Sequence, residues 1–529
     1  MKKWQVIIIL AVAQFVMVLD STVMNVSIST VAADLGTTIS GMQAAITLYA
    51  LTMAALMLTG GKFGDKWGRR KAFVVGSVVY GIGSLMTALS PNLTFLLLGW
   101  SLIEGLGAIL VIPAIASLTA INYSGRDRVV AFSIIGAVAG IAAAAGPLIG
   151  GLVTTYFSWR YVFAAETAIM LVLLLLTRHI KDQPVRKNVS IDVPSSLLSA
   201  SGLALLVFGV LQSKTWGWVN PLNSPEINGV EIAPLGISLV AYFILAGIVT
   251  LWFFFRRQRV LEQNGKVPLV KLSFFSNPVM RAGLSVLLSQ YFAIAAIFFV
   301  VPVYLQTILG YDALQTGVKL VPMSIGLIIF SILGSRLAVT RSARNIARWG
   351  QVGLSVGILL VLASIQPELR SVFFLVGMFV VGAGLGLLAS QLGKVIMSAV
   401  GKSDTAVAGG LQGTFQNLGN SFGTAVVGSV FMLLLASGFN NSIQASPDLS
   451  STAKTEIAKS TGGTVGVVSE KQAKQYILDQ GATTETTDTI AGIYEDSQID
   501  ALRTGLFVVF VVSILALLLS RNLPATVES

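Results

Sequence analysis

Residues 42–90 read MQAAITLYALTMAALMLTGGKFGDKWGRRKAFVVGSVVYGIGSLMTALS, with an apolar stretch on each side of a short basic segment. The apolar stretches cover residues 42–61 and 72–90, and residues 61–71 contain five Lys or Arg residues. At 1.5 Å per residue, a helix of about 20 residues is ~30 Å long, which matches the hydrocarbon core of a bilayer. This region therefore predicts two membrane-spanning helices joined by a tight, positively charged turn.

The same pattern recurs along the whole chain. Of its 529 residues, 54% are hydrophobic and only 11% are charged, whereas soluble proteins carry about 25% charged residues. This composition argues against a soluble enzyme and predicts an all-α polytopic membrane protein. Fourteen spans are expected, at residues 5–28, 42–61, 72–90, 93–120, 129–153, 161–177, 194–213, 233–255, 282–309, 316–337, 347–366, 370–392, 404–437 and 502–520.

The basic residues fall mainly on one side of the predicted membrane. With fourteen spans, 26 of the 35 Lys and Arg residues lie on the side of the N-terminus. Because short loops rich in Lys and Arg stay in the cytoplasm, we expect both termini to be cytoplasmic. The net charge of +11 then reports orientation and gives no reason to expect a nucleic-acid partner.

The segment between the last two spans, residues 438–500, differs from the other loops. It is rich in Ser, Thr, Ala and Gly, and it carries nine acids against four lysines. We expect a polar external loop with a short helix around Lys471–Leu478. A dedicated substrate-binding cap is the alternative interpretation of this segment.

Several kinds of catalytic chemistry lack the residues they need. The chain has no cysteine and no G-x-x-x-x-G-K-[ST] motif, which excludes thiol chemistry and a phosphate-binding loop of that type. Residues Gly353–Gly357 match G-x-S-x-G, but they lie inside a predicted apolar helix, and the only histidine, His179, is in a distant loop. We therefore expect no enzyme and no metal site, with an intramembrane hydrolase based on Ser355 as a remote alternative.

Three acids fall inside predicted spans. At 1.5 Å per residue, Asp20 lies about 22 Å into the first span and Glu104 about 16 Å into the fourth, near the midplane. Glu166 is closer to the end of the sixth span, with Arg160 six residues earlier, so it could be a structural acid near the interface. An acid at membrane depth normally faces a cavity or a partner. Asp20 and Glu104 are predicted to handle protons or a cationic substrate, and a buried neutral or paired acid is the alternative.

Three motifs resemble those of one transporter family. Residues Gly61–Lys71 resemble G-x-x-x-D-R-x-G-R-[RK]-[KR], Leu19–Val26 resemble L-D-x-T-V-x-N-V, and Gly146–Gly151 resemble G-P-x-x-G-G. Together they resemble the major facilitator superfamily and, within it, the fourteen-helix drug:proton antiporter family. This resemblance implies a conformational-switch loop of Gly61, Asp65, Gly68, Arg69 and Arg70, and an antiporter motif of Gly146, Pro147, Gly150 and Gly151.

The resemblance also implies a 6+2+6 arrangement of the spans. It divides the chain into an N-terminal six-helix bundle (1–190), an inserted two-helix pair (191–262) and a C-terminal six-helix bundle (263–529). In this fold the first and fourth helices of each bundle line the cavity, while the sixth span is peripheral. The candidates for proton coupling and substrate binding are Asp20, Glu104, Gln14, Asn25, Gln290, Tyr291, Tyr304, Gln391 and Glu166.

The chain departs from the family pattern in the fourth span. Related antiporters have R-x-x-x-G-x-G there, whereas this chain has Ser101 at the Arg position and Glu104 directly before Gly105. The membrane-embedded base of the family is therefore missing, and an acid stands one turn away from its position.

These features predict a proton-coupled secondary transporter that exports amphipathic, cationic small molecules by alternating access. The expected partners are the substrate, protons and the lipid bilayer, with no cofactor, no nucleic acid and a monomeric state. By the resemblance, the location is the bacterial plasma (inner) membrane. Export of an endogenous metabolite, peptide or lipid-like molecule with altered proton coupling is the alternative, and a non-transporting membrane sensor or scaffold is a more remote one.

Overall fold

The computed structural model describes residues 4–182, 192–227, 230–400, 405–451, 454–455, 457, 465–479 and 483–525. These residues are mostly helical, and their one sheet is a hairpin of β1 (Glu226–Ile227) and β2 (Val230–Glu231). Thirteen helices are long and apolar enough to cross a membrane, and a bent pair of helical segments within α7 makes a fourteenth. The prediction of an all-α membrane protein with fourteen spans is confirmed.

Six spans form the N-terminal bundle. They are α1 (Gln5–Val26), α3 (Ile39–Trp67), α4 (Arg69–Ala88), the continuous α5–η1–α6 (Leu93–Leu96, Leu97–Glu104 and Gly105–Asn122), α7 (Gly125–Tyr156) and α8 (Arg160–Leu176), with the short α2 (Ile28–Asp34) after α1. Helix α7 bends by 43° between Ile134–Ala143 and Ala145–Tyr156. Pro147 explains the bend, because its ring clashes with the carbonyl group four residues earlier in a straight helix.

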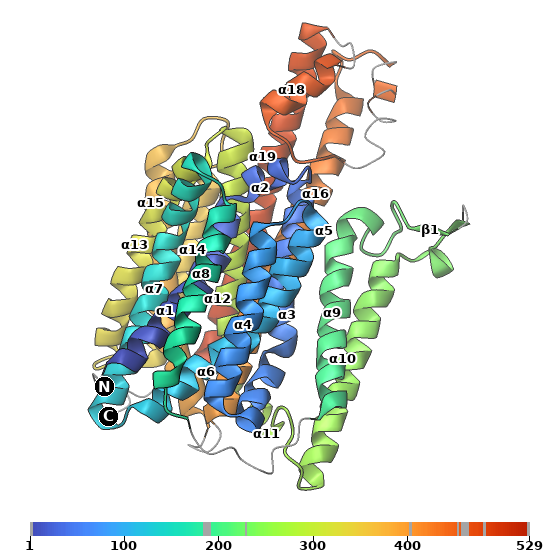
Figure 1. Ribbon diagram of the computed structural model, residues 1–529. Coiled ribbons are helices and arrows are strands. Elements are labelled where there is room, and N and C mark those ends of the chain that lie inside the picture. Colours follow the sequence, from blue (N-terminus) through green and yellow to red (C-terminus); the bar gives the residue numbers. More distant parts are fainter. Residues whose placement is uncertain are drawn as a thin grey trace.

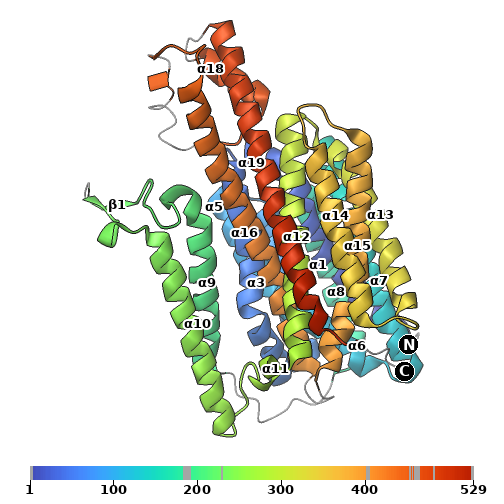
Figure 2. The same ribbon diagram turned by 180° about the vertical axis from the view of Figure 1, so that it is seen from behind.

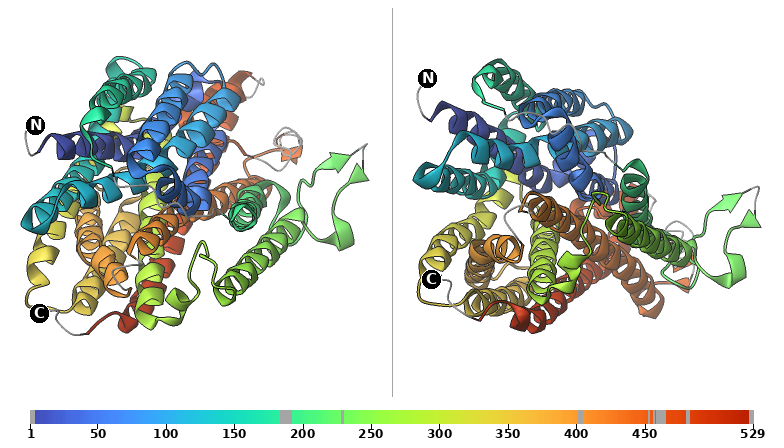
Figure 3. Two further views of the ribbon diagram at one scale, coloured as in Figure 1. Left: turned by 60° about the horizontal axis from the view of Figure 1, so that its bottom comes forward. Right: turned by 90° about the horizontal axis from the view of Figure 1, so that it is seen from below.

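Six further spans form the C-terminal bundle. They are α12 (Pro278–Val303), which continues as the π-helical η4 (Tyr304–Ile308), then α13 (Ala313–Leu337), α14 (Ala343–Ser364), α15 (Ser371–Ser398), α16 (Thr405–Ala445) and α19 (Thr484–Leu519), with the short α11 (Ser273–Ser276) before α12. Seen along the helices, the two bundles lie side by side (Figure 3). The chain begins and ends at the same end of the bundles (Figure 1), as an even number of spans requires. We name this the terminal end and the opposite one the loop end.

The inserted pair stands outside the two bundles (Figures 1 and 2). It consists of α9 (Val193–Trp216) and α10 (Leu239–Gln263), and the expected boundary at 190–191 lies outside the described residues. The pair is tied together at the terminal end, where Arg257 donates two hydrogen bonds of 2.6 Å to Asp192. These bonds are the main reason that the pKa of Asp192 falls from 3.8 to about 2. Helix α10 begins later than the expected residue 233, because Pro234–Gly236 form a separate turn.

The last two spans extend well beyond the bundle at the loop end (Figure 2). Helices α16 and α19 have 41 and 36 residues, so each is over ~50 Å long. The expected short helix is present as α18 (Glu470–Asp479). The expectation of a loop is wrong for residues 438–445 and 484–500, which continue α16 and α19. The ring of Tyr494 on α19 packs 5.9 Å from that of Phe439 on α16, so apolar packing outside the membrane keeps these polar sequences helical.

Candidate functional site

Three acidic side chains meet inside the N-terminal bundle. Asp20 lies on α1, Glu104 is the last residue of η1, and Glu166 lies on α8. Carboxylate oxygens from all three residues lie within 4.8 Å of one another. The exposed fractions of the three residues are 0%, 0% and 1%. We name this group the carboxyl cluster.

Close packing between α4 and the fourth span places Glu104 in the cluster. A Cβ on Gly83 would lie 2.6 Å from the Cα of Glu104, and a Cβ on Gly107 would lie 2.6 Å from the Cα of Tyr80. Side chains at these two positions would push the helices apart, so the glycines are needed for the approach. Residues Leu97–Glu104 are also π-helical, a widening of the helix that is frequent at functional sites.

Trp100 holds Asp20 in place. Its indole Nε1 donates a hydrogen bond of 2.9 Å to Oδ1 of Asp20. The indole ring is itself fixed by stacking on Tyr49, with ring centroids 4.9 Å apart and planes 10° apart. Ser101, which stands at the family's Arg position, donates instead to the carbonyl of Ala45 at 2.8 Å. A neutral indole next to that position therefore serves as the donor to Asp20.

Two donors from α4 reach Glu166. The hydroxyls of Tyr80 and Ser84 donate to Oε2 of Glu166 at 3.3 and 3.2 Å. Among the described residues, Oδ2 of Asp20, Oε1 of Glu166 and both oxygens of Glu104 have no hydrogen-bond partner. The cluster thus has more hydrogen-bond acceptors than there are donors from the neighbouring described residues.

A second feature of the cluster is that it has no basic partner among the described residues. Within the described part of the chain, no Lys, Arg or His forms an ion pair with these three acids. Three negative charges this close together, and away from water, would repel one another strongly. A bound proton or cation would relieve this repulsion.

Arg160 has a different partner from Glu166. It forms an ion pair with Asp34 on α2 and donates to the carbonyl of Ser90 at 2.8 Å. Partial burial disfavours the charged form of Asp34, but hydrogen bonds from Trp159 and Arg160 outweigh this effect and lower its pKa. The alternative of Glu166 as an interfacial acid near Arg160 therefore does not hold. Although the sixth span is outermost in the expected plan, the structure turns Glu166 inward.

The other predicted cavity residues form no hydrogen bond with the carboxyl cluster in the described part of the chain. Four of them donate to backbone carbonyls at 2.7–3.2 Å: Asn25 to Ser21, Gln290 to Leu385, Tyr304 to Gln366, and Gln391 to Gly334. Gln14 and Tyr291 are half-buried. No hydrogen bond between described residues joins any of these six side chains to the cluster.

Sequence reasoning missed the donors Tyr80, Ser84 and Trp100. A signal was available in the third span, where small and polar residues recur at intervals of three and four: Gly76, Ser77, Tyr80, Gly83, Ser84 and Thr87. All six are buried. Such a stripe is typical of a helix face that packs closely and forms hydrogen bonds inside a membrane.

The switch-loop residues lie at the terminal end, where α3 meets α4: Gly61, Asp65, Gly68, Arg69 and Arg70. Arg69 pairs with Asp65 and donates to the carbonyl of Gly61 at 3.1 Å. The backbone of Gly68 has φ +96°, which favours glycine. The carboxylate of Asp182 accepts from the first two backbone N–H groups of α4 at 3.1 and 3.0 Å, a favourable place for a negative charge.

The antiporter motif packs α7 against both α1 and the C-terminal bundle. Gly146 lies against Thr22, and a Cβ on Gly150 would be 2.9 Å from the side chain of Val23. The adjacent residue, Gly151, faces the backbone of Ala313 on α13. The motif is thus the place where α1, α7 and α13 come together.

Hydrogen bonds also join the bundles at the loop end. Gln306 donates to the carbonyl of Val26 at 2.6 Å and accepts from Ser29, while Gln43 donates to the carbonyl of Thr424 at 3.1 Å. All the cross-bundle hydrogen bonds found between described residues lie in this half of the molecule. We name this set of contacts the loop-end seal.

The chain is similar in sequence to known membrane transporters. The sequence model of the Major Facilitator Superfamily matches residues 10–424. The chain is 29% identical over 474 residues to the probable actinorhodin transporter of Streptomyces coelicolor, covering 88% of this chain and 78% of that one. It is 28% identical to the tetracenomycin C resistance and export protein of Streptomyces glaucescens, covering 81% of this chain and 76% of that one.

Solved structures share the fold. The chain aligns with a bacterial homolog of the human lysosomal transporter Spinster, in an inward-facing and unoccupied conformation, with a TM-score of 0.63. That alignment covers 99% of this chain and 98% of the other, at 14% identity. A D-xylose-proton symporter aligns with a TM-score of 0.56 over 81% of this chain and 90% of its own, at 12% identity.

Proposed function

The chain belongs to the Major Facilitator Superfamily, and from this premise we propose that it exports amphipathic, cationic small molecules in exchange for protons. It is a multi-pass transporter of the inner membrane and not an enzyme. Transporters of this superfamily generally need no cofactor, and in our proposal the proton gradient supplies the energy. The observation that carries the proposal is the carboxyl cluster, three buried acids that form no ion pair with a base among the described residues.

Protons and a cationic substrate compete for the same negative charge. When the cluster holds protons it is close to neutral and has little attraction for a cation. When protons leave, the unpartnered oxygens of Asp20, Glu104 and Glu166 attract a cation strongly, because the site is shielded from water. Protons and the cation therefore cannot occupy the cluster together. This mutual exclusion is the physical basis of antiport, since the substrate leaves as protons bind.

The missing Arg fits this scheme. A permanently charged base beside Asp20 would neutralise part of the cluster and repel a cation. The indole of Trp100 orients Asp20 without adding a charge. The substitution of Ser101 for the family's Arg therefore favours a cationic substrate over an anionic one.

Helix α1 links the cluster to the loop-end seal. Thr22 and Val23, which pack on the antiporter motif, follow Asp20 within one turn. A shift of Asp20 on exchanging a proton for a cation would move this turn against α7. Because Gly151 on α7 contacts α13, the same movement would loosen or close the seal, as alternating access requires.

The names of two relatives support an export role. One is described as a transporter of actinorhodin and the other as a protein of tetracenomycin C resistance and export. Both concern the movement of a small molecule across a membrane, which agrees with an exporter of small molecules here.

The decisive experiment is ethidium transport by the purified protein in proteoliposomes with an imposed pH gradient. Wild-type protein should transport ethidium only while the gradient lasts, and a protonophore should stop it. Asp20→Asn and Glu104→Gln keep the size of each side chain but cannot release a proton, so both should reduce transport to the rate of empty vesicles. Glu368→Gln changes an exposed acid between α14 and α15 and should behave as wild type.

Two results would contradict the proposal. Ethidium transport that is unaffected by collapse of the gradient would exclude proton coupling. Full activity of Asp20→Asn would remove Asp20 from the mechanism. If the wild-type protein moves no ethidium, shifts in melting temperature with a panel of metabolites, peptides and lipid-like compounds would test the alternative substrates.

A further inference from the structure

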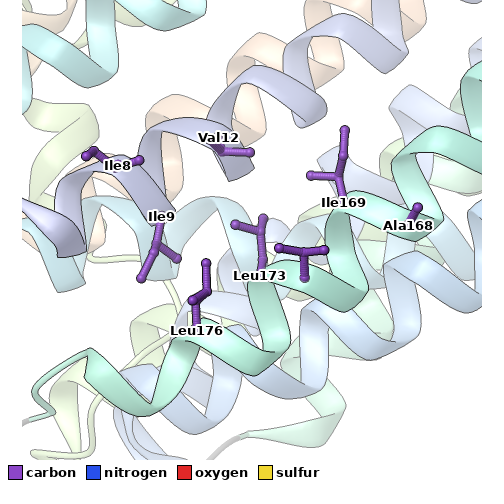
Figure 4. Close-up of a pocket in the computed structure, with 8 residues that line it drawn as sticks. Ile8, Ile9, Val12, Ala168, Ile169, Leu173 and Leu176 are labelled. Atoms are coloured by element: carbon purple, nitrogen blue, oxygen red, sulfur yellow. The ribbon is translucent and has the colours of Figure 1, made fainter.

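A groove lies between α1 and α8 (Figure 4). Its lining residues precede Asp20 on α1 and follow Glu166 on α8, so the groove is nearer the terminal end than these acids are. Its volume is about 350 Å³, which is within the range of small-molecule sites. The lining consists of Ile8, Ile9 and Val12 from α1 and of five residues between Ala168 and Leu176 on α8, all of them aliphatic. Ile8 and Val172 are more than half exposed, so the groove opens sideways toward the bilayer.

The buried edge of the groove, which includes Ile9 and Leu173 at 4% and 3% exposure, lies on the same helix faces as the carboxyl cluster. On α8, Glu166, Ile169 and Leu173 are spaced by three and four residues, so they project on one side. On α1, Ile9 and Asp20 are eleven residues apart, which is about three full turns. Along α8 the axial distance from Ile169 to Glu166 is only about 4.5 Å. The buried edge of the groove is thus aligned with the acids along both helices, and its exposed edge faces the bilayer.

The inserted pair covers another side of the molecule (Figures 1 and 2). There α9 lies over α3 and α16: Thr59 of α3 bonds to Ser196 of α9 at 3.0 Å, and Ser429 of α16 donates to the carbonyl of Val210 of α9 at 2.9 Å. The inserted pair therefore covers the junction between the two bundles on that side. A compound dissolved in the bilayer meets α9 and α10 there, whereas α1 and α8 present an open groove.

We propose that the α1/α8 groove binds the apolar part of a bilayer-dissolved amphipathic organic cation, with its charged end directed toward Glu166. The inference rests on the proposed function and names the route by which its substrate arrives. The lining matches a hydrocarbon or aromatic body and contains no polar group that would retain a charged one. The carboxyl cluster, reached along the same helix faces, supplies the charge that draws the cationic end inward. A neutral acyl chain matches the lining but gains nothing from the acids.

Photolabelling with an azide derivative of ethidium, on protein in liposomes, tests the site directly. Mass spectrometry should locate the label on residues 8–12 or 168–176, and excess ethidium should prevent it. Val172→Trp fills the groove and should reduce labelling about fivefold or more. Leu171→Trp is the matched control, because Leu171 is the adjacent residue, is 60% exposed against 55% for Val172, and does not line the groove.

Transport kinetics provide the second readout. Val172→Trp should raise the KM for ethidium about fivefold while the maximal rate stays within about twofold, as expected when an early binding step is impaired. Leu171→Trp should leave both values unchanged. Ala168→Leu fills the groove with a smaller side chain and should repeat the KM effect if Val172→Trp reduces the yield of folded protein.

Each outcome separates the groove from the proposed function. Equal labelling and equal KM in the Val172 and Leu171 variants would overturn the proposal that the groove binds the cation. Labelling that excess ethidium does not prevent would also overturn it and would indicate a lipid-filled groove only. If Asp20→Asn still abolishes transport in that case, the proposed function stands and only the route fails. If wild-type protein shows no gradient-driven ethidium transport but its groove is labelled saturably, the site stands without the proposed function.

Discussion

Gly151→Ala is expected to open the loop-end seal. A Cβ at this position would lie 2.5 Å from the carbonyl oxygen of Ala313 and 2.8 Å from the Cα of Leu314. Both atoms belong to the backbone of α13, so no rotation of a side chain can relieve the clash. The contact joins the two bundles, and the simplest relief is therefore their separation at this end.

The size of the effect follows from the cost of overpacking. An added methyl group in a tightly packed interface costs about 1–3 kcal/mol, which corresponds to a shift of about 5- to 150-fold in a two-state equilibrium. Gly140→Ala is the matched control, because Gly140 lies on the same helix and a Cβ there would have nothing within 4 Å. Gly140→Ala should leave the equilibrium unchanged.

A single cysteine can report the opening, because the chain has none of its own. Ser27→Cys is nearly isosteric, and Ser27 is 1% exposed beside Val26, whose carbonyl accepts the cross-bundle bond from Gln306. In the Gly151→Ala background, a water-soluble maleimide should label this cysteine about 5- to 150-fold faster than in the parent protein. The same labelling rate in the Gly151→Ala and Gly140→Ala backgrounds would refute the assignment of the seal.

Two further predictions concern hydrogen bonds and pH. Trp100→Phe keeps an aromatic ring on Tyr49 but removes the N–H donor to Asp20, and the loss of this hydrogen bond costs about 1 kcal/mol or more. Ethidium transport should therefore slow while the protein stays folded. An unchanged transport rate would show that the indole N–H is dispensable. The ion pair with Arg257 lowers the pKa of Asp192 from 3.8 to about 2. The ion pair therefore stabilises the folded protein above pH 3.8, and this stabilisation is lost as the pH falls toward 2. Asp192→Asn should therefore lower the Tm at neutral pH and lose this effect near pH 2, whereas a Tm difference independent of pH would contradict the assignment.

The membrane spans could be predicted from the sequence because the bilayer is a demanding solvent. Backbone groups inside it must bond within one helix, so each span has to be a continuous apolar stretch of about 20 residues. This rule applies inside the bilayer and not beyond it. It located all fourteen spans, but it missed the polar continuations of α16 and α19, whose helical state depends on contacts such as that of Phe439 with Tyr494.

Depth in the membrane could also be read from position along a span, and this singled out Asp20 and Glu104. The side of the helix on which a residue projects could not be read in the same way, because nearly every face of a membrane-spanning helix is apolar. Glu166 therefore looked peripheral, although its side chain lies within 4.8 Å of the other two acids.

By itself, then, the sequence determined the number of spans, the family resemblance and the presence of acids without matching bases, because each follows from residue type and spacing along the chain. The tertiary structure decided which residues meet. It joined three acids from α1, η1 and α8, supplied Trp100, Tyr80 and Ser84 as donors, and closed the two bundles at the loop end. These contacts depend on helix rotation and on glycines that allow close approach, and both are settled only when the helices pack.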